Sequence, residues 1–238
     1  MNLLTIVIPC YNEINSLPPL IEKLKEIDLS LNFLIIDNGS SDGSRKYLNK
    51  INSDLPSNID IFYIQKNKGY GSGVLEGLKS IKDSKYIGWI HGDLQFDFSS
   101  LNHAITFLNS ESHNNRDIFY KGVRTNRKII DKLFSKVMGI AASIIFTEKF
   151  NEINAQPTLF SKNLLSLLKN PPSDFSFDTY VYWVALKNNY KIKRGLYEFP
   201  PRIYGESKWN FGIMSRLKFS KQLFMYFLEL RKSKENKT

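Results

Sequence analysis

Asp93 and Gln95 stand two residues apart, directly beyond an apolar run at residues 86–90. In an extended segment, side chains two apart point the same way, so both oxygen-bearing groups are expected to reach one cation. Mg²⁺ and Mn²⁺ favour carboxylate and carbonyl oxygens, and Mg²⁺ commonly keeps substrate phosphates and water in its shell. The pair therefore predicts a metal site for a phosphorylated ligand. A helix-capping role is the alternative for Asp93 taken alone.

Basic residues form two groups that suit phosphate binding. They are Arg124, Arg127 and Lys128, shortly after a predicted strand, and Arg202 and Lys208, on either side of residues 205–207. Basic surface residues are usually solvated, but beside a metal site of this kind they are better interpreted as phosphate clamps. We expect this role above all of Arg124 and Arg202.

The polar run 37–44 follows another apolar strand. Asp37 ends that strand, at a place where a base or a ribose would donate hydrogen bonds to it. The run is no EF-hand calcium loop, because Gly39 takes a ligand position and the closing Glu is absent. It also predicts a turn in which Asp42 or Ser44 caps a helix.

The run 69–73 holds three glycines, but their spacing is not that of a dinucleotide-binding loop. Two interpretations are open. The glycines form either a flexible entry that lets a helix pack closely on the sheet or a direct contact with a nucleotide.

Alternating strand and helix patterns position these groups. Strands are expected at 3–8, 33–36, 59–64 and 86–90, and helices from about 16 and at 44–51, 74–81 and 101–108. Such units imply an open, mostly parallel α/β sheet with helices on both faces, whose ligands lie beyond the carboxyl ends of the strands. The polar segments around Tyr11, Asp37 and Asp93 fall at those ends.

The pattern changes after about residue 117. We expect a strand at 117–123, a helix at 129–146, a loop at 151–157, a helix at 178–188, a strand at 191–199 and a helix at 213–230. The predicted organisation is a catalytic domain over 1–210, followed by a C-terminal helix and basic tail over 211–238. Within the domain, 1–116 form the nucleotide-binding half and 117–210 the acceptor-side half.

The chain of 238 residues carries 33 Lys and Arg against 23 Asp and Glu, a net charge of +10. Such a chain attracts phosphorylated substrates, acidic lipid surfaces or polyanions. Nucleic acid is not the expected partner, because no helix-turn-helix, zinc-finger or RNP pattern is present. We expect no secretory signal and no transmembrane helix. The single cysteine, Cys10, fits a reducing compartment.

Five segments, in this order, carry a resemblance to a known family: 8–13 (IPCYNE), 36–40 (IDNGS), 67–71 (NKGYG), 92–95 (GDLQ) and 202–208 (RIYGESK). They resemble the family 2 inverting glycosyltransferases, and most closely the dolichol- or polyprenyl-phosphate mannose and glucose synthases. The resemblance covers roughly residues 3 to 210. It implies a GT-A fold, a nucleotide-diphosphate sugar donor and a Mg²⁺ or Mn²⁺ cofactor.

The resemblance also implies roles for individual residues. The residues that match positions on the nucleotide side are Pro9, Tyr11, Glu13, Asp37, Gly69 and His91. Asp93 and Gln95 match the metal ligands, and Arg124 matches the basic residue after the fifth strand. The segment that closes over the phosphates is matched by Arg202, Ser207 and Lys208, and Arg127 is assigned to the same group.

This sequence departs from the family at three places. His91 replaces the first acidic residue of the Asp-x-Asp motif, Asn38 replaces the second Asp of a strand-end pair, and 154–157 replace the usual stretch on the acceptor side. We expect His91 to replace a ribose contact, although a neutral imidazole is also a ligand for Mn²⁺. The departures affect the expected identity of the donor sugar and of the acceptor more than the expected type of reaction.

The expected reaction is inverting transfer of a hexose to a polyprenyl phosphate. The alternative acceptor is a hydroxyl of a cell-surface polysaccharide or glycolipid, which requires a general base. Asp178 is the candidate base, with a helix cap as the equal alternative. A non-catalytic nucleotide- or glycan-binding module is the third interpretation.

The predicted terminal helix at 213–230 has apolar residues at helical spacing among basic ones. It is expected either to pack against the domain or to lie on an anionic bilayer. We therefore expect a cytoplasmic enzyme at the inner face of the membrane, either in direct contact with it or held there by a small membrane partner.

Overall fold

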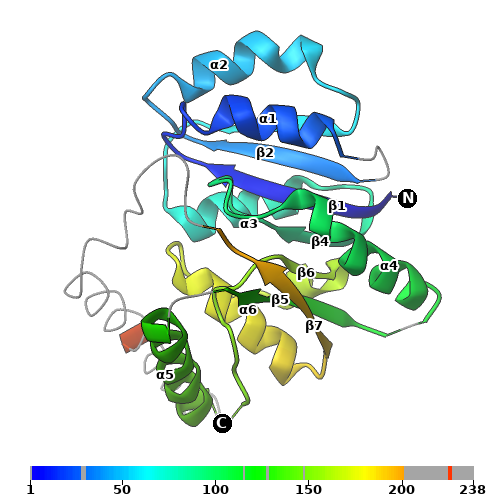
Figure 1. The fold of residues 1–238 in the computed structure, drawn as a ribbon, viewed down its shortest axis with the longest axis vertical. Coiled ribbons are helices and arrows are strands. Elements are labelled where there is room, and N and C mark those ends of the chain that lie inside the picture. Colours follow the sequence, from blue (N-terminus) through cyan, green and yellow to red (C-terminus); the bar gives the residue numbers. More distant parts are fainter. Residues whose placement is uncertain are drawn as a thin grey trace.

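Seven strands form a single sheet in a computed structural model of the chain, in the order β3-β2-β1-β4-β6-β5-β7 (Figure 1). The structure describes residues 2–27, 31–114, 116–126, 129–146, 148–200 and 225–226, without the side chains of 129–132 and 134. The strands are β1 (Asn2–Cys10), β2 (Asn32–Asn38), β3 (Ile59–Ile64), β4 (Ser84–Trp89), β5 (Ile118–Thr125), β6 (Thr158–Ser161) and β7 (Lys191–Glu198). The helices are α1 (Leu17–Lys25), α2 (Ser44–Ile51), α3 (Tyr70–Ser80), α4 (Asn102–Glu111), α5 (Ile129–Phe146) and α6 (Ser176–Lys187).

The sheet is mostly parallel, as the sequence predicts. β1 runs parallel to β2 and β4, β2 runs parallel to β3, and β5 runs parallel to β7. Only β6 is antiparallel to its neighbours, β4 and β5, among the described strands. The sequence analysis did not predict β6, because four residues are too few to show a periodic pattern.

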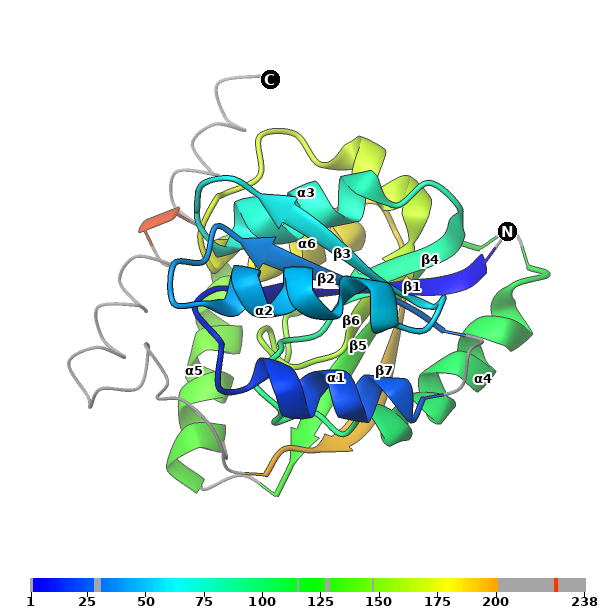
Figure 2. The same cartoon turned by 90° about the horizontal axis from the view of Figure 1, so that it is seen from above.

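Helices cover both faces of the sheet, and each face has its own apolar core (Figure 2). The side chains of β1 alternate between the two cores: Ile6 and Ile8 pack towards α1 and α4, and Val7 packs towards α3. This is why the central strands are continuous apolar runs, since both of their faces are buried. No helix within the described ranges is long and apolar enough to cross a membrane.

Most expected elements appear within two or three residues of their predicted bounds, with one clear error. α3 begins at Tyr70 instead of residue 74, so the glycines at 71 and 73 lie inside the helix. Of the predicted helix at 213–230, only 225–226 are described, and they are helical. The proposed boundary at residue 210 lies outside the described residues and stays a prediction.

The strand register brings the predicted polar segments to one edge of the sheet. Cys10 of β1 lies opposite Asp37 of β2, and Asp37 lies opposite Tyr63 of β3. Because β6 is antiparallel to both β4 and β5, the carboxyl ends of β4 and β5 reach this same edge. The loops after β1, β2, β4 and β5 are therefore neighbours, as expected for ligand sites in open α/β sheets.

Candidate active site

The loops after β1 and β2 are joined by hydrogen bonds between backbone amides and short polar side chains. The amide of Asn12 donates to Ser40 Oγ at 3.0 Å, and the amide of Ser41 donates to Asn12 Oδ1 at 2.8 Å. The amide of Glu13 donates to Ser44 Oγ at 3.0 Å. The segment that holds Tyr11 and Glu13, both predicted nucleotide contacts, is thus braced from the neighbouring loop.

The N-cap position of α2 is Gly43 and not Asp42 or Ser44, which the sequence predicts, but Asp42 stands just before it and accepts an amide at the start of the helix. Its Oδ1 accepts the amide of Ser44, the first residue of α2, at 3.0 Å, and its Oδ2 accepts the amide of Ile14 at 3.1 Å. Burial acts to raise the pKa of Asp42, but the hydrogen bonds from Ser44 and Ile14 outweigh it and lower that pKa.

Asp37 is fully buried, and the described structure uses both of its oxygens. Oδ1 accepts the amide of Ser40 at 3.0 Å, and Oδ2 accepts Nε of Arg45 at 2.5 Å. Arg45 also donates to the carbonyl of Ile64, the last residue of β3. Asp37 therefore holds the turn after β2 and links it to β3, and its predicted contact with a base or ribose stays a prediction.

The glycines of 69–73 allow close packing, which is one of their two predicted interpretations. A Cβ on Gly69 would lie 2.3 Å from the carbonyl oxygen of Ser173, and Gly69 itself has φ of +105°. A Cβ on Gly73 would lie 2.6 Å from the side chain of Asn38, which donates to the carbonyl of Gly69 at 3.1 Å. The interpretation that Gly69 also contacts a nucleotide is not tested by these contacts.

The segment after β4 differs from its predicted form. Leu94 has a left-handed φ of +59°, and Asp93 Oδ1 accepts the amide of Gln95 at 3.2 Å. Asp93 and Gln95 therefore do not project together from an extended strand, because the Asp93 carboxylate closes a tight turn of its own. The capping alternative for Asp93 is also wrong, since Asp97 caps the following 3₁₀ turn.

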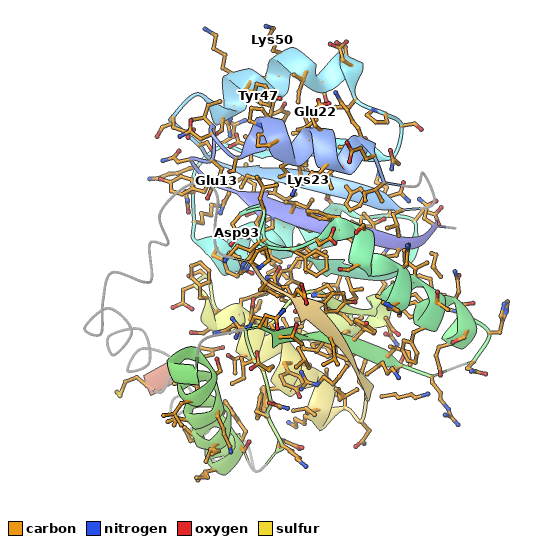
Figure 3. All side chains as sticks on the ribbon, viewed as in Figure 1. Glu13, Glu22, Lys23, Tyr47, Lys50 and Asp93 are labelled. Atoms are coloured by element: carbon orange, nitrogen blue, oxygen red, sulfur yellow. The ribbon has the colours of Figure 1, made fainter. Side chains whose placement is uncertain are left out.

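The oxygen-bearing side chains near Asp93 suit a hard cation whose remaining ligands are phosphate and water. Within the described ranges, no group of three or more His, Cys, Asp or Glu side chains is placed to hold a metal ion. The Gln95 amide nitrogen donates to the Pro200 carbonyl at 3.0 Å, which fixes the orientation of that amide. One carboxylate with an amide oxygen suits Mg²⁺ or Mn²⁺, whose shell is commonly completed by phosphate and water. Figure 3 shows Asp93 and Glu13 at the same edge of the sheet.

His91 contacts the second half of the chain, which is the predicted acceptor side. Its amide donates to Gln156 Oε1 at 2.5 Å, and its Nε2 lies 2.9 Å from the hydroxyl of Tyr70. The Tyr70 hydroxyl donates to Asp178 Oδ1 at 3.1 Å, so it accepts the hydrogen bond from His91 Nε2–H. The Tyr70 ring also stacks on Phe175, with 4.2 Å between ring centroids. The predicted ribose contact of His91 stays a prediction.

Asp178 is buried beneath the edge of the sheet, at the third position of α6. It does not cap that helix, whose N-cap position is Phe175, so the capping alternative is wrong. Burial raises the pKa of Asp178, and the positive charge of Lys121 opposes that rise. Burial likewise lowers the pKa of Lys121 to about 7, and Asp178 opposes that fall. Lys121 Nζ donates to Thr158 Oγ1 at 2.6 Å.

Arg124 lies at the carboxyl end of β5 and is held by two partners. Its Nε donates to Glu152 Oε2 at 3.0 Å, and its terminal guanidinium nitrogen donates to Ser135 Oγ of α5 at 3.4 Å. The remaining predicted phosphate-binding residues lie outside the described ones: Arg127, Lys128, Arg202, Ser207 and Lys208.

Sequence reasoning missed Tyr70, Lys121 and Gln156. Lys121 had a signal, since it interrupts an apolar strand at a position where a lysine is rarely buried without a partner. Gln156 lies in the stretch 154–157 that departs from the family pattern, and its side chain accepts the backbone amide of His91. Tyr70 had no signal other than its neighbouring glycines.

The family model described as "Glycosyl transferase family 2" matches residues 5–162 of this chain. The match includes most of β1 and all of β2 to β6. Of the described site residues considered above, Ser173, Phe175, Asp178 and Pro200 lie outside it.

One similar sequence is that of the undecaprenyl-phosphate 4-deoxy-4-formamido-L-arabinose transferase of Proteus mirabilis. It is 24% identical over 150 residues, which are 58% of this chain and 45% of the relative. The chain therefore spans less than half the length of that relative.

Two solved structures have a similar fold. One is glucosyl-3-phosphoglycerate synthase from Mycobacterium tuberculosis in complex with Mn²⁺, UDP and glucosyl-3-phosphoglycerate. It has a TM-score of 0.65 and 12% identity, and the match covers 97% of this chain and 80% of the synthase. The other is the mannosyltransferase PcManGT from Pyrobaculum calidifontis in complex with GDP-Man and Mn²⁺. It has a TM-score of 0.60 and 15% identity, and the match covers 97% of this chain and 73% of the transferase. At these identities the likeness concerns the fold.

Proposed function

The chain belongs to glycosyl transferase family 2, and on that premise we propose that it moves a hexose from a nucleotide-diphosphate sugar to a polyprenyl phosphate, with inversion. The predicted family and enzyme class are confirmed by the family match, and the predicted GT-A fold by the likeness to the solved transferases. The donor, the metal and the acceptor belong to the proposal.

The reaction needs positive charge where the diphosphate leaves. In a single displacement at the anomeric carbon, negative charge builds on that group, and fixed donors aimed at it lower the barrier. Arg124 suits this role, because Glu152 and Ser135 fix its guanidinium before a substrate binds. The predicted Mg²⁺ or Mn²⁺ site at Asp93 and Gln95 stays in the proposal, with a turn at Leu94 in place of the expected extended segment. The cation would neutralise charge on the leaving group when bound.

The other predicted roles keep their place in the proposal. Around the base and ribose we place Pro9, Tyr11, Glu13, Asp37, Gly69 and His91. Over the phosphates we place Arg127, Arg202, Ser207 and Lys208. The braced loops after β1 and β2 support the first assignment, because a preorganised loop loses less conformational freedom when a nucleotide binds.

The burial of Asp178 is the observation that favours a lipid phosphate over a sugar hydroxyl as the acceptor. A general base must come within hydrogen-bond reach of the proton that it removes. Asp178, the candidate for that task, is enclosed in the core and accepts the Tyr70 hydroxyl instead. A lipid phosphate is already an anion and needs no strong base, and the net charge of +10 favours its binding. The name of the Proteus mirabilis relative points to the same class of acceptor.

Such an acceptor would place the enzyme at the cytoplasmic face of a membrane. The test is to supply UDP- and GDP-sugars with Mn²⁺ or Mg²⁺ and to compare a polyprenyl phosphate with oligosaccharides as acceptors. We expect a lipid-linked sugar, and we expect Asp93→Asn to lower turnover by roughly 10²–10³-fold. Asp97→Asn is the matched control, because Asp97 caps a 3₁₀ turn four residues away.

Three results would contradict the proposal in different ways. Product on oligosaccharides alone would show that the acceptor is a hydroxyl. Equal activity of Asp93→Asn and the unmodified chain would remove Asp93 from the site. Failure of every nucleotide-sugar to bind or turn over would favour a non-catalytic binding module.

A further inference from the structure

A series of polar contacts runs from His91, just beyond β4, to Asp178, in the first turn of α6. Nε2 of His91 lies 2.9 Å from the Tyr70 hydroxyl, and that hydroxyl donates to Asp178 Oδ1 at 3.1 Å. His91 is half-buried, whereas Asp178 is only 2% exposed. The contacts therefore connect a residue at the edge of the sheet, where ligands of such folds lie, with a carboxylate enclosed in the core.

The order of donors and acceptors in this series determines where His91 carries its proton. The Tyr70 hydroxyl has one proton and donates it to Asp178, because an ionised carboxylate can only accept. The Tyr70 oxygen then accepts from His91, which places the imidazole proton on Nε2. In the neutral ring, the other nitrogen, Nδ1, carries a lone pair and is an acceptor.

Packing holds the His91 ring in this arrangement. The Tyr70 ring stacks on Phe175, with 4.2 Å between ring centroids, and meets the His91 ring edge to face at 5.4 Å. The backbone amide of His91 donates to Gln156 Oε1 at 2.5 Å. The imidazole is thus fixed through its backbone by Gln156 and through its Nε2 by Tyr70.

Nδ1 of His91 suits a hydroxyl group of a ligand. It lies on the ring edge that faces away from Tyr70, because Nε2 is directed at that residue. A hydroxyl can donate to this lone pair, whereas an ionised phosphate offers only acceptor oxygens. A nucleotide-diphosphate sugar has hydroxyls on its ribose and on its hexose. We propose that Tyr70 and Asp178 are positioning residues, which hold His91 as its Nε2–H tautomer so that Nδ1 accepts a hydroxyl of the donor.

This assignment gives Asp178 a task other than that of a general base. Its carboxylate acts on the site through Tyr70 and touches no reactant. A carboxylate at position 91, as in the family motif, would also be an acceptor, so His91 keeps that character and removes one negative charge near the expected diphosphate. The choice of ligand rests on the proposed nucleotide-sugar donor, but the tautomer is measurable without any ligand.

The first experiment is long-range proton–nitrogen NMR correlation of the imidazoles in the full chain without ligand. It is run at about pH 8, above the ordinary histidine pKa of about 6.5. The other two histidines, His103 and His113, are exposed and serve as internal references. We expect a proton on Nε2 alone for His91 and averaged tautomers for the two references. A proton on Nδ1, protons on both nitrogens or an averaged signal at His91 would overturn the proposal.

Substitutions of Asp178 separate positioning from a merely structural role. Asp178→Asn keeps an oxygen acceptor and should retain the Nε2–H tautomer. Asp178→Leu removes the acceptor, so the Tyr70 hydroxyl should donate to His91 Nε2 and the imidazole proton should move to Nδ1. Tyr70→Phe keeps the aromatic ring and should leave His91 averaged like the exposed rings, and it decides the question if Asp178→Leu does not fold. An unchanged His91 signal in the folded variants would overturn the proposal.

Binding measurements identify the hydroxyl. His91→Leu should weaken binding of UDP-glucose or GDP-mannose by on the order of tenfold, and His91→Asn, which keeps an acceptor near the Nδ1 position, should recover part of the loss. If the ribose donates, UDP or GDP alone should show the same loss and their dideoxyribose counterparts none. If the hexose donates, the loss should appear only with the nucleotide-sugar. A full loss that persists with the dideoxyribose nucleotides, or no loss with any ligand, would overturn the hydroxyl contact.

The two measurements also separate this inference from the proposed function. If no nucleotide-sugar binds while the His91 tautomer follows the Asp178 variants, the proposed donor and the hydroxyl contact fail and the positioning role stands. If the chain turns over a nucleotide-sugar while His91 carries its proton on Nδ1, the proposed function stands and this inference fails.

Discussion

The two sides of the candidate site are held together by different kinds of interaction. The loops after β1 and β2 are joined mainly by neutral hydrogen bonds between amides and short side chains, such as Asn12 with Ser40 and Ser41. Beneath His91, the structure instead encloses ionisable groups, Lys121 and Asp178, together with the Tyr70 hydroxyl. The first side is a braced rim that also holds the buried Asp37 paired with Arg45, and the second is a buried network around Lys121 and Asp178.

This difference indicates which part of the site is more sensitive to mutation and to pH. A neutral hydrogen bond in a partly exposed loop contributes about 1 kcal/mol and changes little with pH. A buried charge depends on its neighbours, because burial disfavours the charged form and nearby opposite charges restore it. Lys121 and Asp178, beneath His91, should therefore respond more strongly to mutation and to pH than the neutral hydrogen bonds of the loops after β1 and β2 do.

The largest expected effect concerns Lys121 and pH. Its pKa in the folded chain is about 7, below the ordinary lysine value of 10.5, because burial outweighs the attraction of Asp178. Between these two values the unfolded chain binds the extra proton, so the lysine increases stability as pH rises from about 7 to 10.5. The unfolding free energy relative to Lys121→Met should rise through this window, by at most about 1.4 kcal/mol per pH unit.

The measurement is urea unfolding of the unmodified chain and Lys121→Met over this pH range. The difference between the two curves removes the contribution of groups that both chains share. Lys193→Met, which replaces an exposed lysine of the neighbouring strand β7, is the control and should give a flat difference. A flat difference for Lys121→Met as well would mean that its side chain is not enclosed as described.

The next effect compares two tyrosines, one on each side. Tyr70→Phe removes the only hydroxyl placed between His91 and Asp178 in the described structure, and it leaves a buried carboxylate without that donor. We expect a loss of about 1–3 kcal/mol of stability. Tyr63→Phe, on β3, removes a buried hydroxyl that has no hydrogen-bond partner among the described residues, so it should be neutral or slightly stabilising.

Thermal and urea unfolding would measure both variants, and nucleotide titration would report on the site. Tyr70→Phe should also weaken the orientation of His91 and change donor binding, whereas Tyr63→Phe should leave donor binding unchanged. Equal effects of the two variants would contradict the distinction between the sides.

The sequence was informative where neighbouring residues determine the structure. Most strands and helices up to α4, the edge at which Asp37 and Asp93 lie and the turn that Asp42 stabilises follow from local patterns. The geometry of Asp93 and Gln95 was predicted wrongly, because a side chain that accepts an amide two residues on forms a turn where alternation suggests a strand.

The network under His91 could not be derived from local patterns. Tyr70 and Asp178 are 108 residues apart in the chain, and the amide of His91 meets a side chain 65 residues away. Their meeting depends on how α3, α6 and the short strand β6 pack on the sheet. Buried polar groups must find partners, but the sequence does not say which partners those are.

The smallest expected effect concerns the Asp42 carboxylate, which stands before α2. Asp42→Ala removes the acceptor for the amides of Ser44 and Ile14, and loss of a hydrogen bond of this kind typically costs about 1 kcal/mol. Because the pKa of Asp42 is lowered in the folded chain, its contribution to stability is present when the pH is above the ordinary carboxyl pKa. That contribution is lost as the pH falls through the lowered pKa.

Asp54→Ala, at an exposed aspartate of the 3₁₀ turn after α2, is the control. Urea unfolding at neutral and acidic pH should show a difference between the two variants that shrinks on acidification. A difference that stays constant, or one as large as that of Tyr70→Phe, would show that the rim depends on charge as much as the buried network does.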